Sequence, residues 1–386
     1  MTASLTRRHL LAAALAAGVA APFAVPGSAR AAGPAQLTLP APTGPYPVGV
    51  VPLHVVGSPR PRPGGGPPRR RELMISVWYP AQAGGRHPRA EWLAPAALRA
   101  ILEANDFPAD AARTALTAAR VGAPVRRGLG KLPVIVYSHG AHDHRGDHTI
   151  IVQELAAHGY VVVTVGHTGD TFAVFPDGRL VVPEFEPGLG AADFAYDIPF
   201  VLDRVEDLAA GRNPDVDHRP LPSGLCGGLD LRRIGMFGSS KGGTATVITM
   251  SEDRRVKAGL SLDAPMEPTQ GIVLDRPFLL MTAEYTREAA PVAELWSHLT
   301  GWRRNLHVDG AAHNTYGDYR VLIPQLAAAI GMSDEELAGW VGTFPIPRAV
   351  RIQQAYPLAF FDLHLRHRGH LLDGPSPAFP EVRFIP

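Results

Sequence analysis

One short segment combines a serine with the glycines that could expose it as a nucleophile. Gly238-Ser239-Ser240-Lys241-Gly242 has the pattern G-x-S-x-G. The apolar run 234–237 before it reads as a strand, and residues 243–248 after it read as a helix. Between a strand and a helix this pattern is typical of a nucleophile elbow, a strained turn that exposes the serine hydroxyl. The chain has 40 glycines, so a chance match is plausible and the flanking elements decide the prediction of Ser240 as nucleophile.

A serine hydroxyl is a weak nucleophile on its own and needs a base held nearby. Parallel sheets place their reactive loops after the C-terminal ends of strands. His313 lies in Gly310-Ala311-Ala312-His313-Asn314, directly after the predicted strand 305–308. It also satisfies the chain order serine, acid, histidine of α/β-hydrolases. We therefore predict His313 as the base.

Two carboxylates are candidates for the acid that orients this histidine. Asp263 ends the predicted strand 258–262, and Glu284 follows the next strand, 278–282. The ends of neighbouring strands lie about 4.8 Å apart, so either carboxylate could reach the base. The short turn after Asp263 favours a fixed geometry, but topology alone leaves both alternatives open.

An oxyanion hole requires two backbone N–H groups aimed at the developing negative oxygen. One should belong to Lys241, the residue after the nucleophile. The other should follow an earlier strand, and Ala141, after the predicted strand 132–137, is the candidate. Gly140 allows a close approach of the chain. We interpret His139 as a structural hydrogen-bonding residue.

The side chain of Lys241 is unusual for its position. A cation in the first turn of a helix opposes the helix dipole and costs about 0.3–1 kcal/mol. Either the ammonium attracts an anionic group of the substrate, or the side chain extends into water. The sequence leaves both possibilities open.

Residues 142–148 offer three histidines and two carboxylates, which raises the question of a metal. His144 and His148 could share a helix face. However, Asp147 looks like a helix N-cap, and nothing in the spacing sets an open tetrahedral geometry. We therefore expect neither a metal nor a cofactor.

The first 31 residues have the features of an export signal. Arg7 and Arg8 precede the Ala-rich apolar stretch 10–25, and Ala29-Arg30-Ala31 suits a cleavage site. The paired arginines resemble a twin-arginine signal, with an ordinary secretory signal as the alternative. We predict cleavage after residue 31, a secreted protein, and no transmembrane segment in the mature chain.

The composition of the remaining chain excludes several partner classes. The signal holds three arginines and no acidic residue, so its removal changes the net charge from +1 to −2. No polybasic tract suggests nucleic acid or anionic lipid as a partner. The short cluster Arg69-Arg70-Arg71 ends the Pro/Gly-rich loop 58–71. The single Cys226 excludes an internal disulfide and reads as a buried or loop residue.

Apolar periodicity predicts an alternation of strands and helices. We expect strands at 52–56, 72–79, 132–137, 161–165, 233–237, 258–262, 278–282 and 305–308, and helices at 147–158, 192–210, 291–299, 319–329 and 348–366. This alternation implies an α/β protein whose mostly parallel central sheet carries helices on both faces. With the elbow it predicts the α/β-hydrolase fold, as one domain over residues 32–386.

The sequence also resembles a known family, the platelet-activating factor acetylhydrolases (the plasma and intracellular type II branch). The resemblance rests on segments distributed along the mature chain: 43–49, 77–81, 133–140, 155–160, 234–243, 251–253, 261–264 and 310–314. It implies that Ser240 is the nucleophile, His313 the base and Asp263, rather than Glu284, the acid. Ala141 and Lys241 match positions that supply oxyanion-hole amides in the family.

The resemblance implies an exported serine esterase that hydrolyses short-acyl esters in lipid catabolism, with a small-molecule or lipid ester as substrate. Animal members carry a histidine and a large aromatic residue beside the nucleophile, where this chain has Ser239 and Lys241. The alternatives are a general carboxylesterase, an extracellular polyester hydrolase and, outside the enzymes, an inactive hydrolase-fold binding protein.

Overall fold

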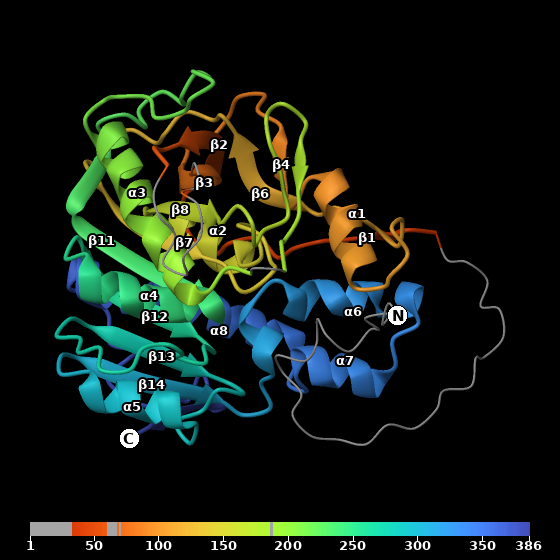
Figure 1. Cartoon of the computed structure of the whole chain (residues 1–386), viewed down its shortest axis with the longest axis vertical. Helices are drawn as coiled ribbons and strands as arrows, with labels where there is room; N and C mark the ends of the chain where they lie inside the picture. Colours follow the sequence, from red (N-terminus) through yellow and green to blue (C-terminus); the bar gives the residue numbers. More distant parts are fainter. Residues whose placement is uncertain (1–32, 60–67, 69–70, 186–187) are drawn as a thin grey trace.

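The structure, a computed structural model, describes residues 33–59, 68, 71–185 and 188–386. The predicted export signal and most of the predicted loop 58–71 lie outside these residues. A sheet forms the centre, with the strand order β15-β14-β13-β12-β11-β7-β8-β3-β2-β6-β4 (Figure 1). Its strands are Val48–Val56 (β2), Glu72–Pro80 (β3), Arg89–Glu91 (β4), Leu116–Val121 (β6), Leu132–Ser138 (β7), Val161–Gly166 (β8), Leu229–Ser239 (β11), Val256–Leu262 (β12), Phe278–Thr282 (β13), Arg303–Val308 (β14) and Val382–Ile385 (β15).

Most neighbouring strands at the centre of this sheet are parallel. β8, β7, β11, β12, β13 and β14 form a continuous parallel block. β3 joins β8 antiparallel, β2 joins β3 antiparallel, and β15 closes the other edge antiparallel to β14. The C-terminal ends of the parallel block therefore meet at one edge, where reactive loops are expected.

Helices cover both faces of the sheet. Alternate residues of its buried strands point to opposite sides, so both faces are apolar and both must be covered. The helices are Pro95–Ala104 (α1), Thr149–Ala157 (α2), Ala191–Ala209 (α3), Lys241–Glu252 (α4), Ala290–His298 (α5), Tyr319–Ile330 (α6), Asp334–Val341 (α7) and Ile346–Arg366 (α8). On β7, Val134 and Val136 join the core beneath α3, α4 and α5. Ile135 and Tyr137 join the core beneath α2 and α8. The predicted α/β-hydrolase architecture is confirmed.

Two short sheets flank this framework. Ala35–Gln36 (β1) pairs with Ala112–Arg113 (β5), and Ala173–Val174 (β9) forms a hairpin with Leu180–Val181 (β10). The hairpin lies in the segment between β8 and α3.

Among the described helices, none combines the length and apolar character needed to cross a membrane.

Candidate active site

Ser240 occupies the turn between β11 and α4. Its backbone has φ 50° and ψ −121°, a conformation that a residue with a β-carbon rarely adopts. The turn is held on both sides. The N–H of Ser240 donates to the carbonyl of Leu262 (2.9 Å), and its own carbonyl accepts from the N–H groups of Gly243 (2.9 Å) and Thr244 (3.1 Å). The strained conformation is therefore fixed by neighbouring backbone, as a nucleophile elbow requires.

The glycines around Ser240 are required by close contacts between backbones. A β-carbon at Gly238 would lie 2.2 Å from the carbonyl carbon of Gly242. A β-carbon at Gly242 would lie 2.1 Å from the carbonyl oxygen of Ser138, at the end of β7. Backbone atoms cannot move aside as a flexible side chain can, so only glycine fits at both positions.

Asp263 and His313 are brought together beside this turn. Asp263 follows β12, the neighbour of β11, and comes directly after the residue that accepts the Ser240 N–H. Its Oδ2 lies 2.7 Å from Nδ1 of His313. Its Oδ1 accepts from the main-chain N–H groups of Ala283 (2.7 Å) and Tyr285 (2.9 Å). The buried carboxylate is therefore fixed by three contacts.

Glu284, the other candidate acid, contacts a different part of His313. Its Oε1 accepts from the main-chain N–H of His313 at 2.9 Å, and its side chain is exposed. Glu284 thus supports the backbone of the short helix His313–Tyr316 (η1), whereas Asp263 contacts the imidazole. Of the two alternatives, only Asp263 occupies the place of an orienting acid.

The environment of His313 adjusts its proton affinity. Burial opposes protonation of the imidazole, but the hydrogen bond and the negative charge of Asp263 outweigh it. The exposed carboxylate of Glu284 acts in the same direction. The pKa of His313 is therefore raised above its usual value of 6.5. A base with a pKa near the working pH suits general acid–base catalysis.

The two predicted oxyanion donors come from adjacent segments. Lys241 is the first residue of α4, where N–H groups have no acceptor within the helix. Ala141 is exposed in the loop after β7, which neighbours β11. A β-carbon at Gly140 would lie 3.6 Å from the Ser240 β-carbon, so this loop passes beside the elbow. Their role as oxyanion donors stays a prediction.

His139, beside these donors, has the structural role expected for it. Its Nε2 accepts from the main-chain N–H of His167 (3.1 Å), so Nδ1 carries the proton and donates to the Gly140 carbonyl (2.6 Å). Burial, followed by the nearby His167, lowers its pKa well below the usual value. A buried neutral imidazole with both nitrogens bonded cannot serve as a second base.

The Lys241 side chain does not extend into water. Its Nζ donates to Oδ2 of Asp170 and to the carbonyl of Leu189, each at 2.6 Å. Only 18% of the side chain is exposed. The ammonium is therefore hydrogen-bonded to two protein acceptors, and the charge of Asp170 compensates it. Sequence reasoning missed Asp170 altogether, although a cation in a first helical turn signals the need for an acidic partner.

The segment 142–148 also differs from expectation. Asp147 is not a helix cap, because its Oδ1 accepts from the Tyr137 hydroxyl (2.6 Å). Instead Asp318 accepts from the first N–H groups of α2, at Thr149 (2.8 Å) and Ile150 (2.9 Å).

His144 and His148 do not share a helix face. α2 begins at Thr149, after His144 and His148. His144 instead packs edge-on against Trp92, with the ring centres 4.6 Å apart. Within the described parts of the chain, no group of three or more His, Cys, Asp or Glu residues is arranged to hold a metal ion. Cys226 is exposed in the loop before β11.

Comparisons with known proteins agree with this fold. Residues 31–175 and 202–364 match the family described as platelet-activating factor acetylhydrolase, isoform II. A probable 1-alkyl-2-acetylglycerophosphocholine esterase of Arthroderma benhamiae is 27% identical over 273 residues, 66% of each chain. The platelet-activating factor acetylhydrolase of Cavia porcellus is 25% identical over 252 residues, 57% of each chain. The matches thus span less than two thirds of the length of these relatives.

A solved structure is similar over a larger part of the chain. The ferulic acid esterase from Streptomyces cinnamoneus is 33% identical and superposes with a TM-score of 0.73. The match covers 92% of this chain and 100% of that one. It therefore includes the whole framework that carries Ser240, Asp263 and His313.

Proposed function

The chain belongs to the platelet-activating factor acetylhydrolase, isoform II, family, and we propose that it is a serine esterase that hydrolyses short-acyl esters. The observation that carries the proposal is the pairing of His313 with Asp263, next to the strained turn of Ser240. An inactive binding protein with this fold would have no need of a base fixed in one orientation.

The reaction follows the logic of a serine triad. Ser240 Oγ attacks the ester carbonyl carbon, and Nε2 of His313 takes the hydroxyl proton. The N–H groups of Ala141 and Lys241 bind the resulting oxyanion. The intermediate collapses, the C–O bond to the alcohol breaks, and the alcohol leaves with the proton from His313. Water then attacks the acyl-enzyme with His313 again as base, which releases the acid and restores Ser240.

Asp263 orients the imidazole of His313 throughout the reaction and is not itself protonated. Its Oδ2 accepts from Nδ1 of His313, so the neutral imidazole presents an unprotonated Nε2 to the serine. The same carboxylate stabilises the imidazolium that forms in each half-reaction. None of these steps requires a cofactor.

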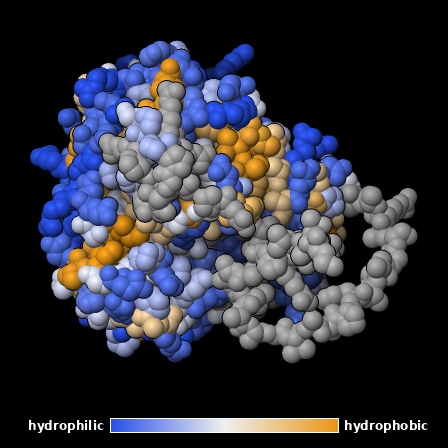
Figure 2. All heavy atoms as spheres, viewed as in Figure 1, coloured by the Kyte–Doolittle hydropathy of each residue, from blue (hydrophilic) through white to orange (hydrophobic). Residues whose placement is uncertain are grey.

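The short-acyl preference is taken from the names of the relatives, a 1-alkyl-2-acetylglycerophosphocholine esterase and an acetylhydrolase. One feature of the structure favours an apolar substrate. Leu180, Val182 and Phe185 expose 41%, 44% and 53% of their surface on and after the β9–β10 hairpin. The Phe185 ring lies 4.5 Å from that of His142, which follows Ala141. Apolar areas also interrupt the mainly hydrophilic surface in Figure 2.

A second candidate function is hydrolysis of hydroxycinnamoyl esters. It is favoured by the ferulic acid esterase, which matches this chain at higher identity and coverage than the curated relatives. A general carboxylesterase or a polyester hydrolase would use the same catalytic residues.

Turnover across a panel of esters separates these functions. The panel contains p-nitrophenyl acetate, butyrate and palmitate, 1-alkyl-2-acetylglycerophosphocholine, methyl ferulate and an insoluble polyester. Each buried CH₂ contributes about 0.8 kcal/mol until an acyl site is full, and longer chains then clash. We expect acetyl and butyryl esters to exceed palmitate by well over tenfold in kcat/KM. A preference for methyl ferulate, palmitate or the polyester would contradict the short-acyl proposal.

We also propose that the protein is exported, on the basis of residues 1–31 alone. The mature chain should begin near Ala32, which N-terminal sequencing of the secreted protein checks. Replacement of both Arg7 and Arg8 by lysine should retain the precursor inside the cell if the route is the twin-arginine one. Undiminished secretion of this variant would indicate the general secretory route.

A further inference from the structure

Asp170 connects the two segments that supply the predicted oxyanion donors. It lies in the loop after β8, and its side chain is 0% exposed. Its Oδ1 accepts from the main-chain N–H of His142 at 2.5 Å, and its Oδ2 accepts from Nζ of Lys241 at 2.6 Å. His142 directly follows Ala141. We propose that Asp170 is a positioning residue that holds the Ala141 and Lys241 amides in the geometry of the oxyanion hole, which rests on the function proposed above.

The Lys241 side of this connection is firmly held. Besides Asp170, its ammonium has the carbonyl of Leu189 as an acceptor at 2.6 Å and lies 5.2 Å from the centre of the Phe194 ring. These partners belong to the loop after β8, the segment before α3, and α3. Lys241, whose main-chain N–H is one predicted oxyanion donor, is thus hydrogen-bonded through its side chain to two other segments, at Asp170 and Leu189.

The loop after β8 also holds the start of the loop after β7, the segment 138–142 that contains Ala141. Oγ of Ser138 lies 3.0 Å from Nε2 of His167, whose Nδ1 lies 3.0 Å from Asp197. The main-chain N–H of His167 donates to the ring of His139. His167 therefore fixes the start of the segment and Asp170 fixes its end, with Gly140 and Ala141 between them. Asp170 is hydrogen-bonded to both donor segments, through the His142 N–H and the Lys241 ammonium.

This arrangement predicts which kinetic constant Asp170 controls. Oxyanion donors act when they lie about 2.7–3.1 Å from the charged oxygen, and loss of one donor costs about 10²- to 10³-fold in kcat. A displacement of about 1 Å can cost about 10²-fold. The ester substrate carries little charge on that oxygen before attack. Loss of Asp170 should therefore lower kcat and leave KM nearly unchanged.

The test uses the full-length mature protein and p-nitrophenyl butyrate. Asp170→Asn should lower kcat by about 10²-fold, with a change in KM below about threefold. Affinity for a trifluoromethyl ketone, which forms a tetrahedral adduct with Ser240, should fall by the same factor as kcat/KM. Affinity for butyramide, a neutral ligand that forms no tetrahedral adduct, should change by less than about threefold. A residue with a merely structural role would not produce this split.

A second variant keeps the test decisive if Asp170→Asn does not fold. Asp170→Asn/Lys241→Met removes both charges, leaves no buried ion unpaired and retains the Lys241 main-chain N–H. It should show the same loss of kcat and of ketone affinity. Because both residues act through one connection, the double variant should be no worse than the worse single variant.

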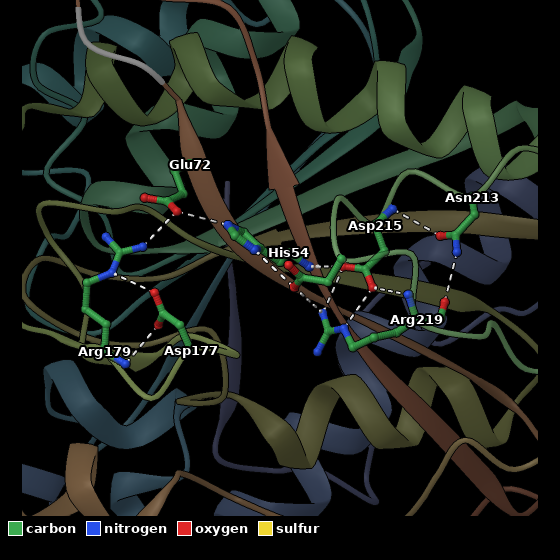
Figure 3. A network of polar contacts seen from close by, with 8 residues as sticks. His54, Glu72, Asp177, Arg179, Asn213, Asp215 and Arg219 are labelled. Carbon is green, nitrogen blue, oxygen red and sulfur yellow. Dashed lines mark hydrogen bonds and ion pairs between the residues drawn. The ribbon is translucent and has the colours of Figure 1, made fainter.

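Asp215 provides a matched control (Figure 3). Its side chain is also 0% exposed, and it accepts from the main-chain N–H of His54 (2.9 Å) and from the Arg219 guanidinium (2.8 Å). His54 belongs to β2, which β7, β8 and β3 separate from β11 in the sheet. Asp215→Asn should lower the melting temperature and keep kcat within about threefold.

Three results would overturn the role of Asp170. The first is a folded Asp170→Asn or double variant that keeps kcat and ketone affinity within threefold of wild type. The second is an equal loss of kcat in Asp215→Asn. The third is a loss of activity that appears as a higher KM, accompanied by an equal loss of affinity for butyramide. A wild-type protein that does not hydrolyse the ester would instead contradict the proposed function, and the oxyanion role with it.

Discussion

The His313 imidazole and the Asp263 carboxylate are 50 residues apart in sequence and 2.7 Å apart in space, from Nδ1 to Oδ2. The other oxygen of Asp263 is occupied by two main-chain N–H groups that follow β13. The main chain of His313 is separately bonded to Glu284. Ring and backbone are therefore fixed by different carboxylates, which gives the two acids distinguishable roles.

Substitution of each acid tests this division. Asp263→Asn should lower kcat by about 10⁴-fold, because an amide donor facing Nδ1 favours the wrong imidazole tautomer. Glu284→Gln keeps an oxygen that can accept from the His313 N–H, so kcat should change by less than about threefold. Steady-state hydrolysis of p-nitrophenyl butyrate measures both. The reverse order of effects would show that Glu284 is the acid.

The pH dependence of kcat/KM tests the environment of His313. The base must be neutral to accept the serine proton, so activity is lost as the pH falls through its pKa. Because Asp263 raises this pKa, the acid limb should have its midpoint above 6.5. In Asp263→Asn burial still lowers the pKa of His313, while the hydrogen bond and the charge of Asp263 that raise it are lost, so the midpoint should move to lower pH. An acid limb at the same pH in both proteins would contradict the assignment.

The capping of α2 by Asp318 predicts a large effect on stability. Asp318 accepts from Thr149, Ile150 and the Trp92 indole N–H at 2.8–2.9 Å, all in a buried site. Asp318→Ala leaves these donors unpaired and should lower the free energy of unfolding by about 2–4 kcal/mol. Ser333, the exposed N-cap of α7, is the control. Ser333→Ala should cost only about 1 kcal/mol in the same urea titration, and equal losses would contradict the argument.

Gly242 allows a direct test of the contact between α4 and β7. Gly242→Ala would place its β-carbon 2.1 Å from the Ser138 carbonyl oxygen, so the elbow and the oxyanion loop must move apart. We expect loss of measurable turnover together with a lower melting temperature. A β-carbon added at Gly339 in α7 would meet no atom within 4 Å outside its own stretch of helix, and Gly339→Ala should stabilise the protein by up to about 1 kcal/mol. Activity retained in Gly242→Ala would show that the contact is not required.

Elements with a clear apolar pattern and sharp boundaries were predictable from the sequence. The strand 278–282 has the predicted bounds, and α6 differs from its prediction by one residue. The edge strand β15 was not predicted because it is short and partly exposed, so it has no continuous apolar run. α7 was also missed, although Ser333 and Glu336 form a capping box that signals its start.

Some residues of the candidate site could be predicted from the sequence, and others could not. Ser240, Asp263 and His313 follow strands, so motif and chain order were sufficient to select them. Asp170 carries no local signal, because its role exists only where the loop after β8 meets α4. Asp318 was missed for the same reason, since it caps a helix 168 residues away in sequence. Contacts between distant segments depend on the packed fold, which local patterns do not describe.

The central claim is that Ser240 is the nucleophile activated by His313, and a covalent label tests it most directly. A serine-directed alkyl phosphonate should add once to the mature protein, and peptide mass spectrometry should locate the adduct on Ser240. Ser240→Ala should take up no label and lose at least about 10³-fold in turnover, with the residual rate supplied by the oxyanion hole. A stoichiometric adduct on another serine, or a fully active Ser240→Ala enzyme, would contradict the account.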